Sequence, residues 1–363
     1  MGNTLSNAAY LACSWLWCLG GFLPLILARD YGWPALLAFT IFNVGGAMAM
    51  GFYFKHRSQQ SEFEQSHKHA IKWFSFVTIA YQVFFITWLS AVIGQPWIIA
   101  GMFALASLFY ISKGAITAWA VAIYVVSIVL FVDFFGRDWP AVDIAAKAYW
   151  PHALLPLAIG FILSPYLDIS FHKAYKNSTH PRASFMLGFG VMFLSLLIFV
   201  FFYAGSLGEV FFKQAIPAQI IYPVVAFLMM QTAFTISAHV SQLRLSQLSK
   251  PVTMMTSLAA ITLVAAGIVF FANNVITQWV EIALEETIYK TFLFFYSLVF
   301  PLYLLLGQFK SLYLWTLALC TPAYSIGFLL GGNSSFALSV GVAIIATALI
   351  IKQRKLTIKH SSN

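Results

Sequence analysis

Long apolar segments, each about the length of a membrane-crossing helix, recur along the whole chain and alternate with short polar stretches. A helix needs about 20 mostly apolar residues to cross the hydrocarbon core of a bilayer. Windows of that kind predict twelve spans, at residues 8–28, 33–54, 72–93, 97–112, 115–135, 150–168, 183–204, 218–240, 251–272, 288–306, 310–330 and 335–352. The connections are too short for a soluble domain, so residues 1–363 are predicted to form a single all-α, polytopic membrane domain.

Composition and charge placement agree with this class. Hydrophobic residues make up 61% of the chain and charged residues only 9%, against about 25% charged in soluble domains. The net charge of +9 is not an indication of nucleic acid, because with the N-terminus inside fifteen of the 20 Lys and Arg residues fall on the cytoplasmic side. That bias follows the positive-inside rule. We therefore expect a multi-pass protein of the cell membrane, with the lipid bilayer as its partner and both termini in the cytoplasm.

The sixth predicted span is the most interrupted. It carries Pro151, Pro156 and Pro165, and Gly160 lies near its middle. In lipid, each backbone hydrogen bond lost at such positions needs a partner within the protein or in a water-filled cavity. The span is therefore predicted to be a discontinuous helix, broken around Gly160, that contributes to a site.

The first span holds a second interruption, the Gly20-Gly21 pair followed by Pro24. A Gly-Gly pair close to a proline is a plausible unwinding point, although, taken alone, a kinked packing helix is the favoured explanation. The first and sixth spans cross the membrane in opposite directions, because they are five spans apart. This spacing fits an inverted five-plus-five repeat with two extra C-terminal helices.

The sixth span ends at Asp168, at the predicted inner boundary of the membrane. His172 follows at i+4, so the two side chains share one face if the helix continues. Ionisable residues near membrane depth often mark pathways, which makes Asp168 and His172 candidates for a gate or a proton-linked site. An interfacial salt bridge followed by a basic loop is the alternative.

Polar side chains repeat along the eighth span. Gln231, Thr235 and His239 recur every four residues and so lie on one helical face. Polar groups in hydrocarbon need partners, so this face is predicted to point into the bundle or a cavity. Bonding of the hydroxyls to their own helix is the simpler alternative. The third span adds Tyr81 and Gln82.

At these positions the chain resembles the leucine-transporter-type superfamily, which includes sodium–solute symporters, nucleobase–cation symporters and amino-acid permeases. The resemblance is carried by the broken centre of the first span, the interruption at Gly160 and the hydroxyl pair Thr235 and Ser237. In that superfamily such hydroxyls often bind a sodium ion. The resemblance implies that Thr235 and Ser237 serve ion coupling, and that a midplane substrate site is lined by Gly20, Gly21, Tyr81, Gln82, Gly160 and Gln231.

The sequence thus predicts a secondary active transporter of a small solute, coupled to sodium or protons, with no catalytic residues and no structural metal site. Two other classes stay open. One is a non-transporting membrane protein, such as a sensor, an assembly factor or a scaffold. The other is an intramembrane enzyme, which could use His152 or His239 with Asp168, although the HExxH motif of a metalloprotease is absent.

Overall fold

The computed structural model describes residues 2–16, 23–24, 27, 31–137, 150–211, 218–269, 284–329 and 334–361. This described part is helical and contains no strand. Eight helical segments within it are long and apolar enough to cross a membrane. The chain therefore fits the predicted class, a helical bundle of a multi-pass membrane protein.

The helices follow one another along the chain, several of them joined end to end through a short 3-10 or π-helical turn. Their bounds are α1 Gly2–Trp15, α3 Trp33–Tyr53, α4 Arg57–Ser66, α5 Lys68–Ile93, α6 Trp97–Ile111, η2 Lys113–Ala115, α7 Ile116–Phe135, α8 Trp150–Leu163, η3 Ser164–Leu167, α9 Ile169–Asn177, α10 Pro181–Leu187, η4 Gly188–Phe193, α11 Leu194–Phe211, α12 Ala218–Leu245, α13 Pro251–Gly267, α15 Leu284–Phe294, η6 Phe295–Val299, α16 Phe300–Leu306, α17 Lys310–Tyr324, η7 Ser325–Leu329 and α18 Ser335–Ser361.

Each of the eight long segments overlaps one predicted span. Three shorter apolar helices, Trp97–Ile111, Leu157–Leu167 and Pro251–Gly267, overlap the fourth, sixth and ninth predicted spans. The first predicted span is represented by α1, which begins six residues earlier than expected, at Gly2. The predicted unwinding point at Gly20 and Gly21 lies outside the described residues.

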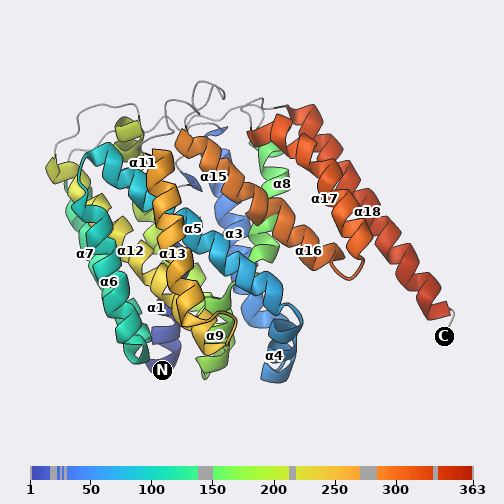
Figure 1. Cartoon of the computed structure of the whole chain (residues 1–363), viewed down its shortest axis with the longest axis horizontal. Coiled ribbons are helices and arrows are strands. Elements are labelled where there is room, and N and C mark those ends of the chain that lie inside the picture. The colour runs from blue at the N-terminus through green and yellow to red at the C-terminus, as the bar shows by residue number, and fades with distance from the viewer. Residues whose placement is uncertain are drawn as a thin grey trace.

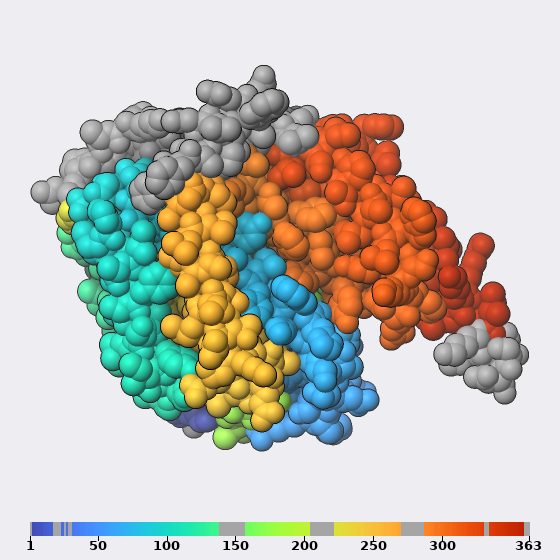
Figure 2. Space-filling model, viewed as in Figure 1, coloured from blue at the N-terminus to red at the C-terminus, as the bar shows by residue number. Residues whose placement is uncertain are grey.

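The bundle is built around α12. In its apolar window 78% of the residues are buried, against 22% for the segments that hold α7 and α18. The N-terminus, α4 and α9 lie at one end of the bundle, and α17 and α18 run side by side along one edge (Figure 1). On the face seen in Figure 2, α13 runs between α5 and α6.

The sixth predicted span is discontinuous, but its break lies beyond Gly160. The α8 helix continues through Gly160 to Leu163, is followed by the 3-10 turn η3, and gives way to extended backbone at Asp168 with φ −78° and ψ 116°. Pro165 has no N–H to donate and its ring clashes with the preceding turn. Next to this break, Ser164 Oγ donates to the Tyr296 carbonyl at 2.6 Å and so links η3 to η6.

Gly160 serves close packing. A Cβ placed there would lie 2.6 Å from Ser297 Cα and 2.7 Å from the Tyr296 carbonyl oxygen, both in the π-helical turn η6. Gly46 has the same role between α3 and α8, where an added Cβ would lie 2.5 Å from the Phe161 carbonyl oxygen. Small residues let helix backbones approach this closely in membrane proteins. The neighbouring Gly45 has no such contact within 4 Å.

Candidate functional site

The break between η3 and α9 is organised by Asp168, whose side chain is fully buried. Asp168 is the N-cap of α9: its Oδ1 accepts hydrogen bonds from the Ser170 amide at 2.7 Å and from Ser170 Oγ at 2.5 Å. A carboxylate at this position satisfies free amides and interacts favourably with the helix dipole. The other oxygen, Oδ2, has no hydrogen-bond partner among the described residues.

His239 of α12 lies opposite this free oxygen. Its Nε2 is 3.6 Å from Asp168 Oδ2, and both side chains are completely buried. The separation is longer than a direct hydrogen bond, and neither nitrogen of the imidazole has a hydrogen-bond partner in the described part of the chain. The pair is therefore a close contact of two ionisable groups that retain unused hydrogen-bonding capacity.

His172, which the sequence paired with Asp168, makes other contacts. Its Nε2 is 2.8 Å from the Tyr166 carbonyl oxygen, and its Nδ1 is 2.7 Å from Gln60 Nε2. Since a carbonyl only accepts and an amide N–H₂ only donates, this geometry assigns the neutral tautomer with the proton on Nε2. Burial lowers the His172 pKa, in agreement with a neutral ring, although nearby Glu64 acts in the opposite direction.

These contacts make His172 a structural link between α9 and α4. Gln60 also donates to Glu64 Oε2 at 3.0 Å, and Glu64 forms an ion pair with Lys176 of α9 at 2.6 Å. The polar segment 55–72, between the second and third predicted spans, thus contains a helix whose Gln60 is fully buried. The polar composition predicted exposure, whereas the buried partners on α9 require the helix to pack.

The N-terminal helix supplies the third side of the site. Ser14 Oγ lies 3.1 Å from Ser170 Oγ, and Thr235 Oγ1 of α12 donates to the carbonyl oxygens of Cys13 and Ser14 at 3.4 and 3.3 Å. Oxygen atoms from a carboxylate, hydroxyls and main-chain carbonyls therefore lie near one another where α1, α9 and α12 meet. Oxygen atoms of these kinds are the ligands that hard cations prefer.

Lys173 brings a positive charge to the same region. Its Nζ lies 5.0 Å from the ring centroid of Tyr10 on α1, a distance at which an aromatic ring attracts a cation. Partial burial lowers the Lys173 pKa to about 8. This lysine is therefore much closer to neutrality at physiological pH than an exposed lysine.

The predicted polar face of α12 is confirmed by its burial, since Gln231, Thr235 and His239 are each at most 1% exposed. The three side chains reach different elements. Gln231 Nε2 donates to Ser127 Oγ of α7 at 3.1 Å, Thr235 contacts α1, and His239 faces Asp168.

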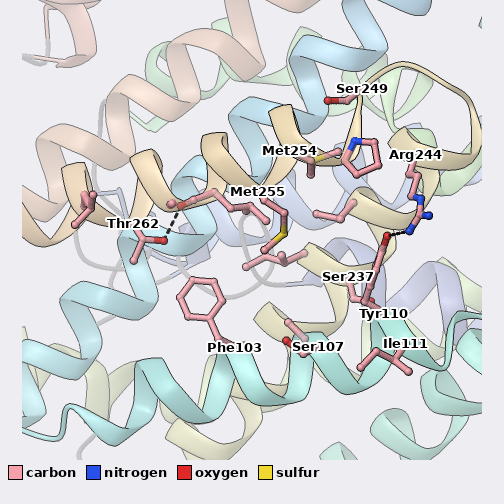
Figure 3. A pocket seen from close by; sticks show the side chains of 17 residues that line it. Phe103, Ser107, Tyr110, Ile111, Ser237, Arg244, Ser249, Met254, Met255 and Thr262 are labelled. Atoms are coloured by element: carbon pink, nitrogen blue, oxygen red, sulfur yellow. Dashed lines mark hydrogen bonds between the residues drawn. The ribbon is translucent and has the colours of Figure 1, made fainter.

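Ser237 lies apart from Thr235. It lines a cavity of about 690 Å³ between α6, α12 and α13 (Figure 3), and its hydroxyl has no hydrogen-bond partner among the described residues. Two residues along a helix correspond to about 200° of rotation. The two hydroxyls that the sequence grouped as ligands of one ion therefore point to different sides of α12.

The remaining predicted substrate contacts lie at separate helix interfaces. The Tyr81 ring is 5.0 Å from that of Phe292 on α15, between α5 and α15. Gln82 is buried, and its Oε1 has no partner among the described residues. Gly160 packs against η6, as described above, while Gly20 and Gly21 lie outside the described residues.

Ser14 and Ser170 were not predicted as site residues, and the pairing of His239 with Asp168 was predicted only for the intramembrane enzyme. The i+4 spacing of His172 favoured the local pairing, which the extended conformation at Asp168 changes. The available signal for His239 was its place on the polar face of α12. Comparison of the chain with protein-family models, curated proteins and solved structures found no match in any of the three.

Proposed function

We propose that this chain is a secondary active transporter of a small solute, in which Asp168 and His239 form the coupling site for a cation. The observation that carries the proposal is a fully buried carboxylate, with one oxygen unpartnered among the described residues, facing a buried imidazole at a helix break. Buried ionisable groups in membrane segments are costly and mark ion pathways and proton relays.

The helix break allows cation binding at Asp168 to change the orientation of α9. Asp168 Oδ1 holds the first turn of α9 through the Ser170 amide and hydroxyl. Protonation of Asp168 removes the charge that these donors stabilise and weakens the cap. The orientation of α9 relative to η3 then depends on whether the cation is bound.

The coupling ion is a proton or sodium. For a proton, Asp168 and His239 are the acceptors. For sodium, the ligands are drawn from the Asp168 carboxylate, the hydroxyls of Ser14 and Ser170, and the α1 carbonyls that Thr235 contacts.

The wider architecture is part of the same proposal. It comprises twelve membrane crossings, an inverted five-plus-five repeat of the leucine-transporter type with two extra helices, and both termini in the cytoplasm of a cell-membrane protein. The substrate site is proposed near the midplane, between the interrupted first and sixth spans and the polar third and eighth. The break at Ser164–Asp168 and the bias of positive charge support this arrangement.

The test begins with the substrate. A thermal-shift screen of the purified protein against small solutes, with and without sodium, identifies a stabilising solute, because a ligand that binds only the folded state raises its stability. Uptake of that solute into proteoliposomes is then measured under an imposed sodium or proton gradient. We expect uptake to follow one of the two gradients.

The decisive variants are Asp168→Asn and its control Asp133→Asn. Asp168→Asn keeps a cap oxygen but removes the charge, and is expected to abolish gradient-driven uptake. Asp133, near the end of α7, is half-exposed and forms a 2.7 Å ion pair with Arg137 just beyond the helix, and its variant should transport normally. Uptake that is unaffected by either gradient, or full activity in Asp168→Asn, would overturn the proposal.

A further inference from the structure

The cavity between α6, α12 and α13 is apolar along most of its length. Its walls include Phe103, Met254, Met255, Leu258 and Leu263. The α13 helix packs mainly on α5, and α5 in turn packs on α12 and α6, so the gap lies between α13 and the α6–α12 pair. Met255 and Leu263 are also 66% and 73% exposed on the outer surface of the bundle. The cavity is therefore open to the side that faces the bilayer.

One end of this cavity is polar. Tyr110, Arg244 and Ser249 gather there, whereas Phe103 and Thr262 lie toward the other end (Figure 3). Arg244 Nη1 donates to the Tyr110 hydroxyl at 2.5 Å. A guanidinium has five N–H donors, and Arg244 forms no ion pair with an acidic residue in the described part of the chain. The Ser249 hydroxyl is buried and has no hydrogen-bond partner among the described residues.

Further positive charge surrounds the polar end. Lys113 Nζ lies 5.2 Å from the Tyr110 ring centroid, and Lys250 is the N-cap of α13. The α13 N-terminus adds the positive end of a helix dipole and its free amides. Among the described residues that line the cavity there is no Asp or Glu. The polar end is thus complementary to an anion, and the rest of the cavity to hydrocarbon.

The polar end lies on the same side of the bundle as α9. Arg244 follows His239 by five residues, about 7.5 Å along α12, and His239 faces the start of α9. The N-terminus and α4 lie at this end as well (Figure 1). In the proposed topology this is the cytoplasmic side, where anionic lipids accumulate and where basic pockets between membrane helices bind their headgroups.

We propose that this cavity is a binding site for one anionic phospholipid. The headgroup phosphate is bound by Arg244, with Lys113 and the α13 N-terminus nearby, and an acyl chain lies against the apolar walls. This site is separate from Asp168 and does not depend on transport activity. A guanidinium suits a phosphate better than an ammonium does, since its planar fork donates to two oxygens at once.

The experiment is native mass spectrometry of the full chain, released from detergent micelles that hold equimolar phosphatidylglycerol and phosphatidylcholine. We expect the protein to retain one phosphatidylglycerol in preference to phosphatidylcholine. Arg244→Gln should reduce the phosphatidylglycerol-bound fraction about fivefold. Arg354→Gln is the matched control, because Arg354 is an exposed arginine on α18, far along the chain from the cavity.

A second pair of variants tests the hydrocarbon part. Ala259→Trp places a large side chain in the cavity wall and is expected to remove lipid retention whatever the headgroup. Ala122→Trp, at an exposed position on α7, should leave it unchanged. Neither position is in the buried core, so both variants are expected to fold, which their elution profile and melting temperature will show.

Four outcomes would overturn the proposal. Equal retention of the two lipids would show that charge does not select the occupant. Unchanged phosphatidylglycerol binding in Arg244→Gln would place the phosphate elsewhere. If millimolar inorganic phosphate displaces the bound phosphatidylglycerol while the protein stays intact, the cavity binds a free anion. If the protein is a dimer that Ala259→Trp abolishes, the cavity binds a second copy of the chain.

Discussion

Asp168 Oδ2 lies 3.6 Å from His239 Nε2, and neither side chain is exposed to any measurable degree. Two ionisable groups buried this close together interact more strongly than they would at a surface, because little solvent screens them. The other oxygen of the carboxylate, Oδ1, accepts a hydrogen bond from the Ser170 amide at the start of α9. A change in charge at this pair therefore affects the backbone at the helix break.

The two functions of Asp168, cap and charge, are separable by substitution. Asp168→Asn retains an acceptor for the Ser170 amide, whereas Asp168→Ala removes it. We expect Asp168→Ala to lower the free energy of unfolding by about 1 kcal/mol more than Asp168→Asn does, the usual cost of a lost N-cap. Equilibrium unfolding in detergent measures this difference, and equal stability of the two variants would contradict the capping role.

Gly160→Ala should destabilise the protein by about 1–3 kcal/mol, the usual cost of overpacking. The added Cβ would lie 2.6 Å from Ser297 Cα, and main-chain atoms cannot move aside as a flexible side chain can. Gly45→Ala is the control, because nothing lies within 4 Å of its added Cβ. That variant should be neutral or slightly stabilising, since alanine favours helix. The melting temperatures of the two variants decide the comparison.

The buried, neutral His172 predicts a pH dependence of stability. Its pKa is lowered in the folded protein, mainly by burial, with Glu64, Asp168 and Lys176 as the charged neighbours. In the unfolded chain its pKa is about 6.5. Below that pH the unfolded state binds the additional proton, so stability falls as the pH drops from about 6.5 toward 5.

His172→Gln should flatten this part of the stability curve, because glutamine does not titrate and can still donate to the Tyr166 carbonyl. Melting temperatures measured from pH 7.5 to pH 5 test this. His56→Gln, at an exposed position before α4, is expected to leave the slope unchanged. If the slope is the same in His172→Gln as in the wild type, the pH dependence has another origin.

Thr235 and Ser237 should differ in their effect on transport. Thr235→Val keeps the shape of the side chain but loses the hydroxyl that contacts the Cys13 and Ser14 carbonyls. We expect it to lose most of the gradient-driven uptake. Ser237→Ala removes a hydroxyl that faces the α6–α13 cavity and is expected to transport normally. An equal loss of gradient-driven uptake in both variants would show that Ser237 also takes part in ion coupling.

The positions of the apolar helices could be predicted from the sequence, because hydrophobic length and helix period are local properties. The inward orientation of Gln231, Thr235 and His239 could be predicted for the same reason, and their burial confirms it. The partners of these side chains could not be predicted from the sequence. Ser127, Ser14 and Asp168 are distant along the chain, and which helices become neighbours depends on packing that no single span specifies.

The position of the helix break shows a related limit. Gly160 and Pro165 both weaken a helix, and the prediction from the sequence located the break around Gly160. Gly160 remains helical because the space left by its missing side chain is filled by the backbone of η6. At Pro165 the ring interrupts the helix, and the break is stabilised because Ser164 bonds to a carbonyl of η6 and Asp168 caps the next helix. Contacts outside the span decide between the two.

The three polar residues of α12 also limit how that helix can move. Gln231, Thr235 and His239 cover about 12 Å of helix axis, and each contacts a different element. Rotation of α12 about its own axis would separate all three contacts at once. During any conformational cycle, α12 is therefore expected to keep its orientation, while α1, α7 and α9 tilt or slide relative to it.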